Sequence, residues 1–261
     1  MAYKFCTQTD TGRARANNED SVAYDEAARL AVLADGMGGY NAGEVASSMA
    51  TAFIKSEMSR WLSEAGQHAS VREIGRALAI CVDNANRAIA NAARANPQYA
   101  GMGTTLVVGV FQGAKFMLGH LGDSRCYRLR HGVLLQITRD HSLLQEQLDA
   151  GLLTPAQAAG SMNRNLVTRA LGVEDDMLLE LHEHDVEPGD LYLMCSDGLS
   201  DMLDDGQIAK ILAAPGALEQ KADRLVVAAN ENGGRDNITV LLVQADGAEE
   251  KKRGLISRWW G

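Results

Sequence analysis

The chain of 261 residues is long enough to bury one large core, either in a single large domain or in two small ones. It carries 34 acidic residues against 25 lysines and arginines, which gives a formal net charge of −9. This balance argues against nonspecific nucleic-acid binding, which requires a basic surface, and suits a protein that collects carboxylates to hold cations.

The sequence shows no sign of a membrane segment or of a disulfide framework. The N-terminal stretch MAYKFCTQTD lacks the apolar core of a signal peptide, and no run of about 18 apolar residues could span a membrane. The four cysteines, Cys6, Cys81, Cys126 and Cys195, form no C-x-x-C pair. They predict reduced thiols in a cytoplasmic protein, which we expect to be a monomer.

Two helices are predicted in the first hundred residues. Asn41 and Glu44 resemble a capping pair, and apolar residues follow at near-helical spacing. Those predicted to face the core are Val45, Met49, Phe53 and Trp61. Ser70 and Glu73 form a second capping pair, and the helix that they begin is expected to end before Asn96-Pro97.

From Thr104 the pattern changes to short apolar runs separated by turns, which predicts an antiparallel meander up to residue 138. The polar stretch 141–172 predicts short helices and a loop. The elements expected after it are strands at 177–185 and 190–196, helices at 204–213 and 217–232, and a last strand, ITVLLV. This order predicts an α+β fold.

The composition changes near residue 246, so we expect one domain over residues 1–246 and a separate tail over 247–261. The tail ends in KKRGLISRWWG, which is basic and aromatic in an otherwise acidic chain. It could be a disordered end, an interfacial anchor or a docking segment.

Acidic residues recur at the ends of the predicted strands. In LAVLADGMGG an apolar strand ends at Asp35, which three glycines follow; an ordinary strand and turn would give the same pattern. The other acids in such positions are Asp123 and Asp197 after strands and Glu19, Asp20 and Asp236 before strands. If these strand ends meet, the cluster must raise its pKa values or bind cations. Oxygen ligands suit Mg²⁺ or Mn²⁺ rather than zinc, and a nearby arginine suggests a phosphate ester as a further ligand.

Seven motifs, in order and spacing, resemble those of the metal-dependent type 2C Ser/Thr protein phosphatases, in their compact bacterial form. They are TDTGRARANNEDS, LADGMGG, GMGTTLV, LGDSRCYRLR, TRDHS, CSDGL and GGRDNITVLLV. The resemblance covers about residues 4–245, the expected catalytic domain. It implies two antiparallel β-sheets packed face to face, with helices flanking them on both sides.

The resemblance also implies a site that holds two Mn²⁺ or Mg²⁺ ions. Asp35 would bridge the ions, the carbonyl of Gly36 would bind the second, and Asp197 and Asp236 would complete the first. Glu19 would act on the second ion through water.

Four further roles follow from the same resemblance. Asp123 would share a weaker third ion with Asp197, and Asp20 would lie beside Glu19. Arg15 matches the phosphate-binding arginine, whereas the spacing of Arg13 does not match. Asn237 would orient Asp236.

The implied reaction is hydrolysis of phosphoserine and phosphothreonine in proteins by direct attack of a hydroxide that bridges the two metals, opposing a bacterial Ser/Thr kinase. Two alternatives stay open: a two-metal phosphodiesterase, and a module that binds phosphopeptides without cleaving them. The sequence names neither the kinase nor its substrates.

Several side chains that could carry other chemistry are expected to be structural. Cys195 lies in an apolar strand and lacks the C-x5-R pattern of a phosphatase nucleophile, and His182 and His184 are expected on the surface. Met37 stands where many animal relatives carry a histidine that is a candidate general acid. His141 is expected to be structural, although it would be the first residue to test if an acid were required.

Overall fold

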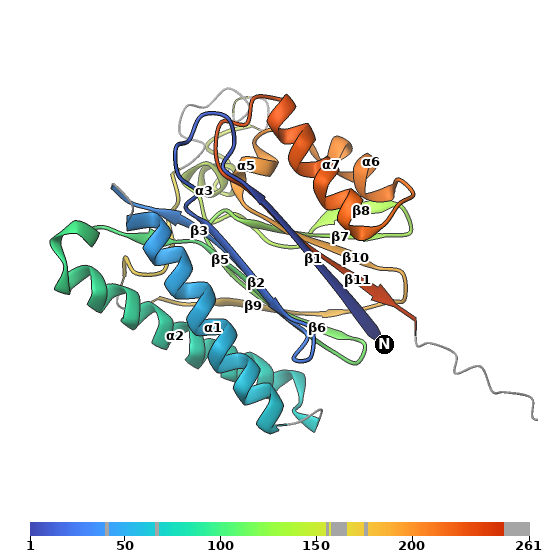
Figure 1. Ribbon diagram of the computed structural model, residues 1–261, viewed down its shortest axis with the longest axis horizontal. Helices are drawn as coiled ribbons and strands as arrows, with labels where there is room; N and C mark the ends of the chain where they lie inside the picture. The colour runs from blue at the N-terminus through green and yellow to red at the C-terminus, as the bar shows by residue number, and fades with distance from the viewer. Residues whose placement is uncertain (40–41, 66–67, 155–156, 158–165, 175–176, 248–261) are drawn as a thin grey trace, which may run out of the picture.

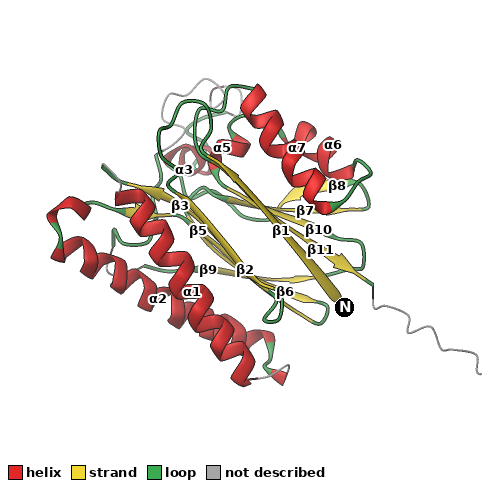
Figure 2. Cartoon of the chain, in the orientation of Figure 1, coloured by secondary structure: helices red, strands yellow, loops and turns green. Residues whose placement is uncertain are grey.

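The computed structural model describes residues 1–39, 42–65, 68–154, 157, 166–174 and 177–247. Two antiparallel β-sheets pack face to face, and helices cover the outer face of each, as the resemblance implied (Figure 1). Figure 2 shows the same four layers, with strands between two helical layers.

The first sheet has the strand order β1-β11-β10-β7-β8. Its strands are β1 (Ala2–Asp10), β11 (Ile238–Asp246), β10 (Leu191–Cys195), β7 (Arg125–Arg130) and β8 (Val133–Gln136). The second sheet has the order β2-β3-β5-β6-β9, and β4 pairs with β3. Its strands are β2 (Asp20–Asp25), β3 (Leu30–Met37), β4 (Gly103–Thr104), β5 (Leu106–Gln112), β6 (Lys115–Leu121) and β9 (Glu180–Asp185).

Two long helices, α1 (Ala42–Ala65) and α2 (Val71–Ala95), cover the second sheet, and the short η2 (Pro97–Tyr99) follows α2 (Figure 1). The first sheet is covered by α6 (Asp205–Ala213) and α7 (Leu218–Glu231). The short helices α3 (Leu143–Asp149) and α5 (Asp197–Ser200) lie in connections. The predicted capping box of α2 is confirmed: the Ser70 side chain accepts from Glu73 N–H, and Glu73 accepts from Ser70 N–H.

The core has three parts because the central strands are buried on both faces. Along β3, Leu30, Val32 and Ala34 face the helices, whereas Ala31 and Leu33 face the other sheet. Between the sheets, the Phe111 ring stacks on Phe116 with centroids 4.2 Å apart. This double burial holds the strand ends rigidly, which is what a site built on strand ends requires.

The predicted meander is wrong at one turn. The strands β5 and β6 pair, and so do β7 and β8, but β6 pairs next with β9 rather than with β7. The chain crosses from one sheet to the other at Gly122 and Asp123. A hairpin turn and a crossing between sheets use the same turn residues, so the local sequence cannot distinguish them.

The predicted core stripe of α1 is displaced by about one residue. The residues expected in the core are only partly buried. The fully buried face instead consists of Ala42, Ala46, Ala50, Ile54 and Met58. The small alanines let the helix lie close to β3, with which it makes extensive contact. The expected cap at Asn41 lies outside the described residues.

Three further expectations concern membrane helices, the cysteines and the C-terminal tail. In the described ranges, no helix is both long and apolar enough to cross a membrane. All four cysteines are free, and Cys81, Cys126 and Cys195 are buried. The strand β11 ends at Asp246; apart from Gly247, the expected tail lies outside the described residues.

Candidate active site

A pocket of about 290 Å³ gathers most of the acids that the sequence placed at strand ends. Asp35 and Gly36 come from β3, Asp123 from the crossing between the sheets, and Asp197 from the start of α5. The full described lining is Arg15, Glu19, Asp35, Gly36, Met37, Gly38, Thr105, Asp123, Val167, Asp197 and Asp236. Five carboxylates and one arginine therefore face a single cavity.

The backbone of Asp35 is held by two threonines that the sequence reading did not single out. Asp35 N–H donates to Thr105 Oγ1 at 3.0 Å, and the Asp35 carbonyl accepts from Thr104 Oγ1 at 2.8 Å and from Thr105 N–H at 2.9 Å. These bonds fix the end of β3 from both sides. The Thr-Thr pair after GMG was the available signal, but a pairing across some 70 residues cannot be read from spacing.

The glycine after Asp35 is required by close approach of the backbone. A Cβ on Gly36 would lie 2.1 Å from the Gly43 carbonyl oxygen and 2.6 Å from the Glu19 carbonyl oxygen. Gly36 N–H donates to that Glu19 oxygen at 3.1 Å. No side chain fits here, so glycine brings the end of β3, the Glu19 segment and the start of α1 together.

Burial, and after it the crowding of negative charge, raises the pKa values of the pocket carboxylates. Burial, followed by the charges of Asp20, Asp197, Asp123 and Asp236, raises the pKa of Asp35 well above its usual range. Burial and then the charges of Asp123 and Asp236 do the same to the pKa of Asp197. For Asp123, burial and then the Asp140 charge raise the pKa to about 6. Ionising these carboxylates together therefore costs free energy unless a cation binds beside them.

Asp20 lies behind the pocket as the strand partner of Asp35. Its Oδ2 accepts from Ser196 Oγ at 2.7 Å, while its Oδ1 is buried and has no hydrogen-bond partner within the described part of the chain. Burial raises the pKa of Asp20 to about 6. A buried oxygen without a partner, beside several carboxylates and a close backbone carbonyl, fits a hard divalent cation with oxygen ligands.

Arg15 is the cationic side chain of the described lining. Its Nη2 donates to Asp236 Oδ2 at 2.7 Å, and half of its side chain is exposed. The hydrogen bond that Arg15 donates to Asp236 raises the pKa of Arg15. Burial raises the pKa of Glu19, and the Arg15 charge lowers it in part. Arg13 is exposed and does not belong to the described lining.

Asn237 contacts Asp236 through its backbone and the N-terminal loop through its side chain. Asn237 N–H donates to Asp236 Oδ1 at 2.8 Å. Its Oδ1 accepts from Glu19 N–H at 2.7 Å, and its Nδ2 donates to the carbonyls of Thr11 and Asn17. The side chain that was expected to orient Asp236 thus holds the loop that carries Arg15 and Glu19.

A family model described as Protein phosphatase 2C matches residues 8–248. The chain belongs to the protein phosphatase 2C family. It is 41% identical over 247 residues to the serine/threonine protein phosphatase PstP of Mycobacterium tuberculosis, covering 93% of this chain but only 45% of that relative. It is 37% identical over 246 residues to the serine/threonine phosphatase Stp of Listeria monocytogenes, with 92% of this chain and 94% of that relative covered.

A solved structure with the same fold is the catalytic domain of PstP in complex with two manganese ions. It superposes with a TM-score of 0.83 at 38% identity, covering 94% of this chain and 99% of that one. The chain thus spans about half the length of the mycobacterial relative and nearly all of its catalytic domain.

Two alternative reactive groups in this protein phosphatase 2C chain are unsuited to catalysis. Burial raises the pKa of the Cys195 thiol to about 12, so a thiolate nucleophile is disfavoured. His141 is buried outside the described pocket lining, and both of its ring nitrogens are hydrogen-bonded within the fold. Met37 does line the pocket, and its thioether has no proton to donate.

Proposed function

We propose that this chain is a Mn²⁺- or Mg²⁺-dependent phosphatase that hydrolyses phosphoserine and phosphothreonine in proteins. The observation that carries the proposal is the pocket that gathers five carboxylates beside the half-exposed Arg15, where burial and then neighbouring negative charge raise the pKa of Asp35 and Asp197. The names of the PstP and Stp relatives, and the two manganese ions of the PstP catalytic domain, support the same reaction and cofactor.

The side chains of Asp35, Asp197, Asp236 and Glu19, with the carbonyl of Gly36, would hold two ions, and Asp123 would share a weaker third with Asp197. When bound, such ions supply an activated water near neutral pH and withdraw charge from the phosphoryl group. The raised pKa values of Asp35 and Asp197 fit this role. A carboxylate that is costly to ionise by itself is stabilised most when a cation binds to its ionised form.

Arg15 is proposed to bind the substrate phosphate. A guanidinium can contact two phosphate oxygens at once, and Asp236 already orients it toward the pocket. The loop that carries Arg15 is fixed by the Asn237 side chain through Thr11 and Asn17. Arg15 would therefore orient the phosphate and offset the charge that grows on its equatorial oxygens.

The expected substrates are phosphorylated proteins, with a cognate bacterial Ser/Thr kinase as the opposing activity. The domain boundary at residue 246, the monomeric state and the cytoplasmic location stay predictions.

Phosphate release from a phosphothreonine peptide tests the proposal, after chelation and with Mn²⁺ restored. We expect release only with Mn²⁺ or Mg²⁺, and much slower cleavage of a bis-aryl phosphodiester. Faster cleavage of the diester would favour a phosphodiesterase. Tight peptide binding without release would favour a binding module.

A further inference from the structure

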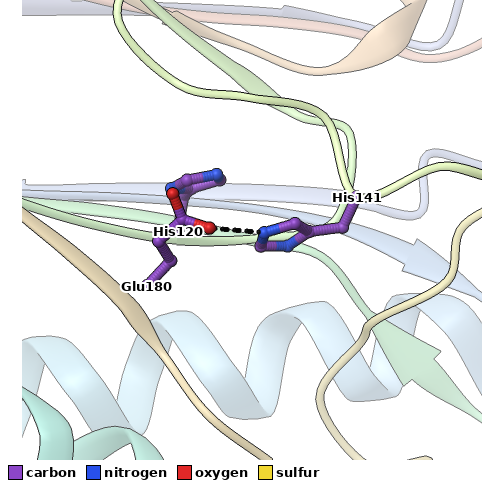
Figure 3. A group of neighbouring side chains, drawn as sticks. All are labelled: His120, His141 and Glu180. Carbon is purple, nitrogen blue, oxygen red and sulfur yellow. Dashed lines mark hydrogen bonds and ion pairs between the residues drawn. The ribbon is translucent and has the colours of Figure 1, made fainter. Parts of the chain in front are cut away.

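Two buried histidines and a partly exposed glutamate lie next to the crossing between the sheets. His120 belongs to β6, His141 follows β8, and Glu180 begins β9. Figure 3 shows the Glu180 carboxylate beside the two imidazole rings, joined to His141 by a hydrogen bond. The rings of His120 and His141 stack with centroids 4.7 Å apart.

A transition metal is the first ligand to consider for this cluster, because one potential ligand atom from each residue lies within 4.8 Å of the others. The hydrogen bonds oppose it. Gly122 N–H can only donate, and it points at His141 Nδ1 from 3.2 Å, so Nδ1 must be unprotonated. His141 Nε2 then carries the proton, which it donates to Glu180 Oε2 at 2.9 Å. A metal on Nε2 would force a proton onto Nδ1, facing the Gly122 N–H.

We propose that His141, oriented by Glu180, is a positioning residue that fixes the Gly122–Asp123 crossing and the Val167 wall of the active site. The inference rests on the proposed function only for its effect on metal binding and turnover. The tautomer and the contacts that it invokes belong to the metal-free protein.

On one side, His141 holds Gly122 through hydrogen bonds to both its N–H and its carbonyl group. Its ring accepts from Gly122 N–H, and its own backbone N–H donates to the Gly122 carbonyl at 2.9 Å. Gly122 has φ +92°, a conformation that favours glycine, and a Cβ there would lie 2.6 Å from Thr105 Cγ2. Asp123 follows directly, so the direction of this peptide sets where the carboxylate enters the pocket.

On the other side, His141 ties down the pocket wall. Its carbonyl accepts from Thr168 N–H at 2.9 Å, and the adjacent Ser142 pairs with Val167, which lines the pocket. One residue thereby connects the segment before Asp123 with the segment that carries Val167.

His120 and Glu180 hold the ring in this orientation. His120 Nε2 hydrogen-bonds the Arg139 carbonyl at 2.9 Å, two residues before His141. Glu180 Oε2 contacts His141, and its Oε1 contacts the exposed His182 at 2.6 Å. His182 shares the carboxylate but is exposed and makes neither of the His141 contacts to Gly122, so it is a matched control.

The first test is the tautomer of His141 in chelated, metal-free protein, read from two-bond ¹H–¹⁵N correlations of labelled histidine. We expect the Nε2–H form in the wild type, unchanged by Zn²⁺, and protected exchange of the Gly122 amide. An Nδ1–H form, an imidazolium, or stoichiometric Zn²⁺ shifts at both His120 and His141 would overturn the proposal. This NMR measurement does not require the protein to be catalytically active.

The second test compares two substitutions that each keep one half of the clamp. His141→Asn retains an acceptor where Nδ1 faces Gly122, whereas His141→Gln retains only the reach toward Glu180. In His141→Gln we expect calorimetric titration to show that the weakest Mn²⁺ site binds about tenfold less tightly, and amide exchange at Gly122 to be faster. In His141→Asn and in the control His182→Ala, both the Mn²⁺ affinity and the exchange rate should remain close to those of the wild type. Equal behaviour of the two His141 variants would contradict the proposed clamp. A wild type without phosphatase activity would refute the proposed function and leave these readouts intact.

Discussion

Asp123→Asn should stabilise the metal-free protein, although Asp123 belongs to the proposed active site. Burial and then the Asp140 charge raise its pKa from 3.8 to about 6. At pH values above both pKa values, the folded state must hold an ionised carboxylate where charge is disfavoured, which lowers the free energy of unfolding. This penalty disappears as the pH falls through 6 toward 3.8. At about 1.4 kcal/mol for each pKa unit, the penalty amounts to about 3 kcal/mol.

Urea unfolding in chelator, at about pH 8 and about pH 4.5, measures this effect as the difference between variant and wild type. We expect Asp123→Asn to raise the free energy of unfolding by about 1–3 kcal/mol at the higher pH, since the new amide loses some interactions, and by much less at the lower pH. Asp149→Asn is the control, because Arg139 lowers the pKa of that exposed carboxylate and no gain should appear. An Asp123→Asn variant no more stable than wild type at about pH 8, or a stability difference independent of pH, would show that the buried Asp123 charge does not destabilise the fold.

Three further predictions concern catalysis. Asp35→Asn should lower the rate of phosphate release roughly 10³-fold or more, and calorimetry should show weaker Mn²⁺ binding; an active variant would remove Asp35 from the proposed metal site. Arg15→Ala should lower kcat/KM by about 10–10³ with near-normal Mn²⁺ affinity, whereas a loss confined to Arg13→Ala would mean that the wrong arginine was chosen. Wild-type rates on aryl phosphates should fall steeply as the pKa of the leaving phenol rises, and Met37→His should flatten that slope; a flat wild-type slope with rate-limiting chemistry would indicate an acid not yet identified.

The fold and the charged residues of the pocket were predictable because the motifs are specific and the carboxylates mark strand ends, whereas Thr105 and Val167 in its lining were not. The crossing at Gly122 was not, since the turn after β6 has the sequence of a hairpin turn. Its consequence is functional: a meander would keep β6 and β7 in one sheet, and the crossing is what brings Asp123 to Asp35 and Asp197.

Two other features were missed for different physical reasons. The alanine face of α1 carries a weaker hydrophobic signal than Phe53 or Trp61, so the larger residues were assigned to the core. The hydrogen bonds of Asn237 to Thr11 and Asn17 join segments more than 200 residues apart, and no spacing rule reaches that far. Such contacts depend on the packed fold.

Anomalous scattering from crystals grown with Mn²⁺ would locate the bound metal and decide whether the acidic pocket is the metal site. We expect two ions in the acidic pocket, contacted by Asp35, the Gly36 carbonyl, Asp197 and Asp236. An empty acidic pocket, or manganese found instead between His120, His141 and Glu180, would contradict this expectation.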